Sequence, residues 1–148
     1  MDKPIISYHV LQQDSSYTKQ SSFYAGTYTG RMPLEVSIRI WNNYKGVEDV
    51  EDLYDFSIVA HFLTKEDNAL LPYVKMSVTN DIEIPIIVEN DAAVGRFVDP
   101  VVLRGGANTG SDEYTNNYIN VTITFDTGAD VYLKDHDLKS LIIEIVEL

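Results

Sequence analysis

Cysteine is absent from the 148 residues of this chain. Disulfide bonds and thiolate metal ligands are therefore excluded, and stability has to come from packing or from neighbouring subunits. Basic residues are scarce, because 11 Lys and Arg stand against 23 Asp and Glu and leave a net charge of −12. A surface of this charge repels a phosphate backbone, so no direct contact with nucleic acid is expected.

Long apolar runs are missing as well. The longest, such as IPIIV, are too short to cross a bilayer, and the N-terminus lacks the charged and apolar regions of a signal peptide. We therefore expect no membrane partner, and a location in the cytoplasm or in a particle assembled there. The length and the hydrophobic fraction of 45% suit one core, so residues 1–148 are expected to form a single domain.

Strict two-residue alternation of apolar and polar side chains dominates the sequence. In PLEVSIRIW, the side chains from Leu34 to Ile40 at even positions point to one side, and Trp41 points to the other. YINVTITFD and the run from Ile82 to Val88 repeat this pattern, which is typical of half-buried strands. FSIVAHFL, YVKMSV and LIIEIVEL are apolar on both sides. These three indicate central strands covered by a second layer or by another subunit.

Helical periodicity is rare. Its best example is GVEDVEDLYDF, where Val47, Val50 and Leu53 or Tyr54 recur at spacings of three and four. This pattern predicts one short helix or helical turn with a solvated acidic face. TKEDNALL and KDHDLKSL could each add one turn. The chain is thus predicted to be all-β, an antiparallel β-sandwich or jelly roll of about eight strands with one short helix.

The segment 12–30, QQDSSYTKQSSFYAGTYTG, is polar but holds four aromatic residues. It can be interpreted as a long surface loop or irregular hairpin, as an arm lying extended on a neighbouring subunit, or as a ligand-recognition segment. In the arm, the aromatic residues would contribute large contact areas at low entropic cost. These residues are Tyr17, Phe23, Tyr24 and Tyr28.

The glycine-rich stretch RGGANTGSDEYTNN lacks the lysine and hydroxyl residue of a phosphate-binding loop. We interpret it as a long mobile connection between strands, and whether residues 105–117 bind a ligand stays open.

Four aspartates lie close together in TFDTGADVYLKDHD, namely Asp126, Asp130, Asp135 and Asp137. DTGAD predicts a hairpin turn, in which the first two aspartates bond backbone N–H groups. The spacing of a calcium-binding loop is absent. No metal site is therefore expected, although cation binding by the four aspartates is left open.

No catalytic or cofactor signature stands out. The three histidines are scattered without metal-ligand spacing, and no nucleophile elbow is present. We therefore expect no cofactor and no enzyme. A triad of residues distant in sequence remains an alternative, and a hydrolase would require a pocket with paired carboxylates or a Ser–His contact.

The acidic cysteine-free sandwich, the aromatic polar segment, the two-sided apolar strands and the final run LIIEIVEL together resemble the small structural proteins of tailed-bacteriophage virions. Members of that group decorate a capsid or form rings at the neck and tail. The resemblance is one of general style across the chain, so no functional residue is carried over. It implies a structural subunit of a virion, assembled in the host cytoplasm through contacts with the same or a different protein.

The interface residues predicted for such a subunit are Tyr17, Phe23, Tyr24, Tyr28 and Trp41. Trp41 is expected to be partly exposed on the outward face of its strand. The alternative function is a carbohydrate-binding β-sandwich module, with Trp41 and Tyr114 or Tyr118 around a groove.

Overall fold

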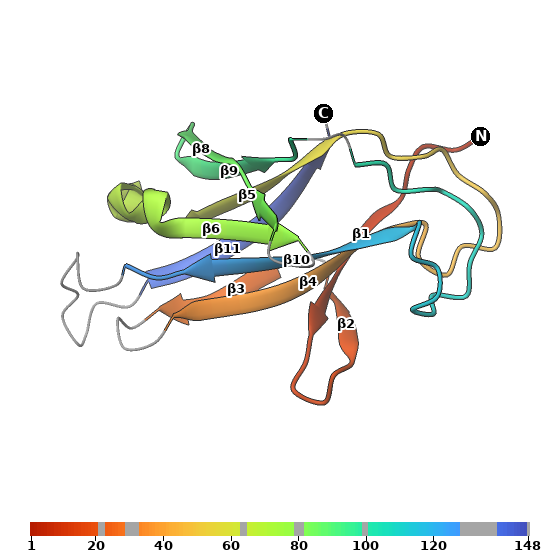
Figure 1. Cartoon of the computed structure of the whole chain (residues 1–148), viewed down its shortest axis with the longest axis horizontal. Helices are drawn as coiled ribbons and strands as arrows, with labels where there is room; N and C mark the ends of the chain where they lie inside the picture. Colours follow the sequence, from red (N-terminus) through yellow and green to blue (C-terminus); the bar gives the residue numbers. More distant parts are fainter. Residues whose placement is uncertain are drawn as a thin grey trace.

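The computed structural model describes residues 1–20, 23–28, 33–62, 65–78, 82–98, 101–127 and 139–147. Two antiparallel sheets pack face to face (Figure 1), and a short 3-10 helix, η1 (Lys65–Tyr73), lies at one end. The predicted all-β sandwich is confirmed, with more strands than the expected number.

The six-stranded sheet has the order β2-β1-β4-β10-β6-β7, and the five-stranded sheet has the order β3-β11-β5-β9-β8. The strands of the first sheet are β1 (Ile6–Leu11), β2 (Tyr17–Gln20), β4 (Leu34–Asn42), β6 (Val74–Val78), β7 (Ile82–Ile84) and β10 (Tyr118–Phe125). Those of the second are β3 (Phe23–Tyr28), β5 (Phe56–Phe62), β8 (Ile86–Glu89), β9 (Ala92–Arg96) and β11 (Lys139–Glu147).

The core lies between the sheets and follows the predicted alternation. Ile40 of β4 pairs with Tyr8 on one side and with Ile119 on the other, and Ile40 itself is completely buried. Across the core, the rings of Phe62 and Phe125 meet edge to face with centroids 5.1 Å apart. The two sheets are thus held by interdigitating apolar side chains from their inner faces.

The run from Ile82 to Val88 does not form one strand. β7 ends at Ile84 in the six-stranded sheet, and β8 begins at Ile86 in the five-stranded sheet. Pro85 separates them, because proline has no N–H to donate to a continuous ladder. Both sheets therefore end on strands joined by a single residue.

The predicted helix over residues 46–56 is wrong. This segment runs as an irregular loop, in which Val50 bridges to Asp2 and Leu53 bridges to Leu103. Val47 is 93% exposed, so the spacing of three did not mark one buried helix face. The helix of the structure, η1, falls instead in the stretch TKEDNALL, where one extra turn was considered.

Residues 12–30 do not form a free arm in the part that the structure describes. β2 pairs with β1, and β3 pairs with β11, so the segment supplies one edge strand to each sheet. The hairpin of β1 and β2 extends beyond the sandwich body (Figure 1). Among the described residues, no helix has the length and apolar character needed to span a membrane.

Candidate functional site

Two long loops run side by side at one end of the sandwich. They comprise residues 43–55 and 101–117, at the right of Figure 1. Leu53 and Leu103 exchange backbone hydrogen bonds, and the Val50 N–H donates to the Gly105 carbonyl at 2.8 Å. A Cβ atom at Gly105 would overlap the Val50 carbonyl, so this approach requires glycine.

Buried asparagine side chains hold these loops together. Asn42 accepts a hydrogen bond from the Ile5 N–H and donates to the carbonyls of Glu51 and Leu103. Similar bonds to loop backbone are made by Asn43, Asn108 and Asn117. All four are at most 9% exposed. Residues 104–117 belong to the predicted long connection between strands, here between β9 and β10, and several of their backbone groups are bonded to the neighbouring loop.

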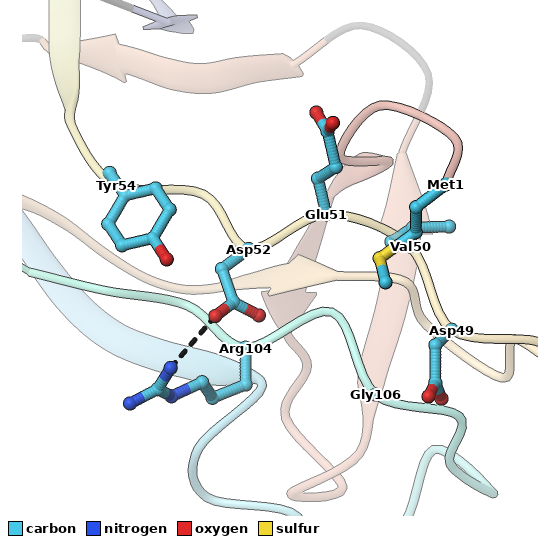
Figure 2. Close-up of a pocket in the computed structure, with 8 residues that line it drawn as sticks. All are labelled: Met1, Asp49, Val50, Glu51, Asp52, Tyr54, Arg104 and Gly106. Carbon is cyan, nitrogen blue, oxygen red and sulfur yellow. Dashed lines mark hydrogen bonds and ion pairs between the residues drawn. The ribbon is translucent and has the colours of Figure 1, made fainter.

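An open groove of about 730 Å³ lies beside the paired loops (Figure 2). Three carboxylates line it, from Asp49, Glu51 and Asp52, together with Arg104 and the phenol ring of Tyr54. Tyr54 is 64% exposed. The groove therefore offers an aromatic surface beside hydrogen-bonding groups of both polarities, an arrangement suited to a polar uncharged ligand.

Asp52 is the most constrained carboxylate of this groove. Its Oδ1 atom accepts a hydrogen bond from the Gly105 N–H at 2.9 Å, and its Oδ2 atom lies 2.8 Å from Arg104 Nη1. The Gly105 N–H, and after it the Arg104 guanidinium, lower the pKa of Asp52 below its ordinary value. Within the described residues, no group of three His, Cys, Asp or Glu side chains is placed to hold a metal ion.

A second polar cluster covers the outer face of the six-stranded sheet around Arg39. The guanidinium lies between the rings of Tyr17 and Tyr118, 4.1 Å from each centroid. Its Nε donates to Asn120 at 2.8 Å, and its Nη1 pairs with Asp112 at 2.6 Å. The ring of Tyr17, which was predicted to contact a neighbour, is therefore engaged with Arg39 of its own chain.

Trp41 is buried, and the expectation of partial exposure is wrong. Only 1% of its surface is accessible, because the rings of Tyr44 and Tyr118 contact it at centroid distances of 5.1 and 4.7 Å. The outward face of β4 is thus covered at this end by the hairpin and the loops. Trp41 does meet Tyr118, as the carbohydrate-binding alternative supposed, but the pair forms no open platform for a sugar.

A Ser–His contact that the sequence did not indicate lies nearby. Ser7 Oγ is 2.8 Å from His9 Nε2, on the same face of β1. The two residues are only 6% and 1% exposed. A pocket of about 220 Å³ reaches His9, Arg39 and Trp41 but not Ser7, so the hydroxyl is closed off from it. In the sequence, the only sign of this contact is that Ser7 and His9 are two residues apart on one strand. That spacing alone does not distinguish them from any other two residues on the same face of a strand.

Several predicted residues cannot be placed. The side chains of Phe23, Tyr24 and Tyr28 on β3 lie outside the described part of the chain, as do Asp130, Asp135 and Asp137. Asp126 is exposed just after β10. The prediction about cation binding by the four aspartates therefore falls mostly outside the described residues.

The outer face of the five-stranded sheet carries a row of apolar side chains. We call it the outer apolar face, and it consists of Val59, Ile87, Val94, Ile142 and Val146. Ile87 is 58% exposed and Val146 is 43% exposed. Val94, in contrast, is only 9% exposed, so the solvent-exposed part of this face lies at Ile87 and Val146.

Charged groups on this same face are paired with one another. Glu144 lies 3.8 Å from His61, and Glu89 lies 4.0 Å from Arg96. The Glu89–Arg96 contact is an ion pair, and the Glu144–His61 contact becomes one only when His61 is protonated.

Comparison of the chain with protein-family models, with curated proteins and with solved structures gives no match. No residue role is therefore transferred from a relative, and function follows from the contacts and surfaces described above.

Proposed function

We propose that this protein is a non-enzymatic structural subunit that acts through protein–protein contacts in a multi-subunit assembly. The observation that supports the proposal is the outer apolar face. β5 and β11 are apolar on both sides, and one of those sides forms the core. On the outer side of the sheet, Val146 of β11 and Ile87 of the edge strand β8 remain open to solvent. Covering such a face gains roughly 25 cal/mol for each Å² of apolar surface removed from water.

Charge favours the same surface. The chain carries a net charge of −12, which disfavours close approach of another acidic protein over most of the exterior. On the outer apolar face, Glu89 lies beside the Arg96 guanidinium, and Glu144 lies beside His61, which carries a charge only when it is protonated. Cores of protein interfaces are depleted of unpaired charge in the same way.

The assembly that we propose is a tailed-bacteriophage virion, with the subunit on the capsid or in the neck or tail. The resemblance in composition and strand pattern supports this choice. Assembly would take place in the host cytoplasm, and the acidic exterior would keep free subunits apart until the outer apolar face meets its partner.

Gradient sedimentation of lysates from cells that make the whole assembly tests the proposal. The wild-type chain should travel with large particles, whereas Val146→Lys should remain near the position of the free 16.7 kDa chain. Val146 is partly exposed, so the substitution should leave the core intact. Val47→Lys, at a loop position that is 93% exposed, is the matched control and should travel with the particles.

A wild-type chain that stays at the position of the free monomer in those cells would contradict the proposal. If Val146→Lys also enters the particles, the outer apolar face is not the contact.

Carbohydrate binding is a second candidate, favoured by the groove of Figure 2 rather than by Trp41. Tyr54 supplies an exposed ring there, and Asp52 is held in place by Arg104 and Gly105. A glycan array at millimolar sensitivity should then give a signal that Tyr54→Ala abolishes. No signal for the wild-type chain removes this candidate.

A further inference from the structure

β8 is a weakly protected edge strand. It is the last strand of the five-stranded sheet, and no described residue pairs with it on the side away from β9. Natural sheets blunt such edges with lysine, internal proline or a bulge. β8 reads Ile-Ile-Val-Glu, and its pairing with β9 is regular along its whole length. The strand therefore has no lysine, internal proline or bulge, and its protection is limited to its length of four residues and to Glu89 at its end.

The open hydrogen-bonding groups of β8 can be assigned. The Pro85 carbonyl accepts a bond from the Arg96 N–H at 3.1 Å, so this pair of residues is of the hydrogen-bonded kind. Such pairs alternate with non-bonded pairs along an antiparallel ladder. Ile87 therefore directs its N–H and C=O towards β9. Ile86 and Val88 direct theirs towards the open edge.

We infer that β8 pairs with β8 of a second copy of this chain, so that two five-stranded sheets join across a twofold axis. Ile87 then lies opposite Ile87 of the second copy, and Ile86 lies opposite Val88. This inference rests on the proposed function and names the partner. In this register every open N–H and C=O of Ile86 and Val88 meets its counterpart.

The neighbouring registers are worse. Side chains of directly opposite residues in an antiparallel pair point to the same side of the sheet. The twofold axis must therefore lie midway between the two copies of one residue, which is then paired with itself. If it passes through Val88, Ile86 faces Asn90, which lies in the turn with a φ of 50°. If it passes through Ile86, Val88 faces Ile84, which belongs to the other sheet. Only the register centred on Ile87 stays within β8.

The chemistry of the strand fits a second copy. Its one charged residue, Glu89, lies 4.0 Å from Arg96 and falls opposite Pro85 of the second copy. Two chains of net charge −12 can thus meet here without bringing unpaired carboxylates of β8 together. The two Ile87 side chains would also touch, which makes the outer apolar faces of both copies continuous.

A single introduced cysteine tests this pairing, because the chain has none of its own. In a non-hydrogen-bonded antiparallel pair, opposite Cα atoms lie about 4.5 Å apart, within the range that a disulfide spans. Ile87→Cys should therefore form a disulfide-linked dimer nearly completely under mild oxidation. Ile87 is 58% exposed, so the variant should fold, and circular dichroism checks that it does.

Val47→Cys is the matched control at a more exposed position and should give only background dimer on a non-reducing gel. Val88→Cys should also lag behind Ile87→Cys, because it faces Ile86. Equal rates of disulfide formation for Ile87→Cys and Val47→Cys would overturn the pairing, and faster disulfide formation by Val88→Cys would overturn the register.

If Ile87→Cys fails to form the disulfide while the wild-type chain still enters large particles, the β8 pairing is wrong and the proposed function stands. If the wild-type chain never enters particles, the proposed function itself fails.

Discussion

Arg39 and Trp41 lie on the outward side of β4, yet both are buried. Alternation correctly placed them away from the sandwich core, because successive side chains of a strand point to opposite faces. What covers that outer face comes from distant parts of the chain. Tyr17 arrives on the β1–β2 hairpin, and Tyr118 and Asp112 arrive from β10 and the loop before it. The alternation of apolar and polar residues within β4 could not predict these contacts on its outer face.

Replacement of Trp41 should therefore damage stability rather than association. Trp41→Ala should lower the free energy of unfolding by about 3–5 kcal/mol, because it leaves a cavity among Tyr44, Tyr118 and His9. Urea unfolding measures this loss. Tyr54→Ala, at an exposed aromatic position, should change stability little. A Trp41→Ala variant as stable as the wild type would contradict the burial.

Asp52 should give the protein part of its pH dependence. Its folded-state pKa lies below the ordinary value of 3.8, so the unfolded chain binds more protons as the pH falls through that region. Its stabilising contribution is thus present above about pH 4 and is lost in acid. Asp52→Asn should be less stable than the wild type at pH 7, and the difference should shrink below pH 3.8. Urea unfolding at both pH values checks this, and a constant difference would rule it out.

At the scale of elements, the paired loops were the least predictable feature. Their carboxylates and glycines suggested a solvated helix and a mobile connection. The structure instead joins them through buried amide groups, each of which satisfies backbone atoms of the other loop. The sequence does not distinguish an asparagine in a solvated loop from one in a buried hydrogen-bond network. The role of the side chain depends on which backbone carbonyls lie within hydrogen-bonding distance in the folded protein.

Asn42 is the best probe of this network. Asn42→Ala should cost about 3 kcal/mol, because it leaves the Ile5 N–H and the Glu51 carbonyl without this partner and removes one of the two bonds to the Leu103 carbonyl, which keeps the Leu53 N–H. Asn116→Ala removes a similar but exposed side chain from the same loop and should be nearly neutral. Thermal unfolding of both variants makes the comparison, and equal losses would speak against the network.

The first thirty residues show the same dependence on context at the level of strands. The polar and aromatic composition of residues 12–30 suggested an arm as one interpretation, but this segment supplies the edge strands β2 and β3, and β1 before it lies between β2 and β4. Tyr8 and Val10 of β1 pack against the core. Deletion of this segment would remove part of the fold and could not isolate an interface.

At the scale of the whole molecule, the excess of acidic residues sets the conditions for association. Two copies of net charge −12 repel one another at a distance, and in the proposed pairing only short-range apolar and backbone contacts at β8 and the outer apolar face would oppose that repulsion.

Self-association should therefore strengthen with salt. Screening shortens the range of the repulsion from about 30 Å at 0.01 M salt to about 3 Å at 1 M. The dissociation constant measured by sedimentation equilibrium should fall across that range. An interface held by intermolecular ion pairs would show the opposite trend, so a rising dissociation constant would exclude an apolar one.

The sequence by itself determined that this protein is an antiparallel sandwich, because the two-residue period of a strand is set by backbone geometry and appears directly in the order of apolar and polar residues. It also determined the acidic, cysteine-free character of the surface. Only the tertiary structure decided that Trp41 is covered, that Pro85 divides one run between two sheets, and that β8 ends with an open edge. Each of these depends on which distant residues come together, and the order of residues within one strand does not specify that.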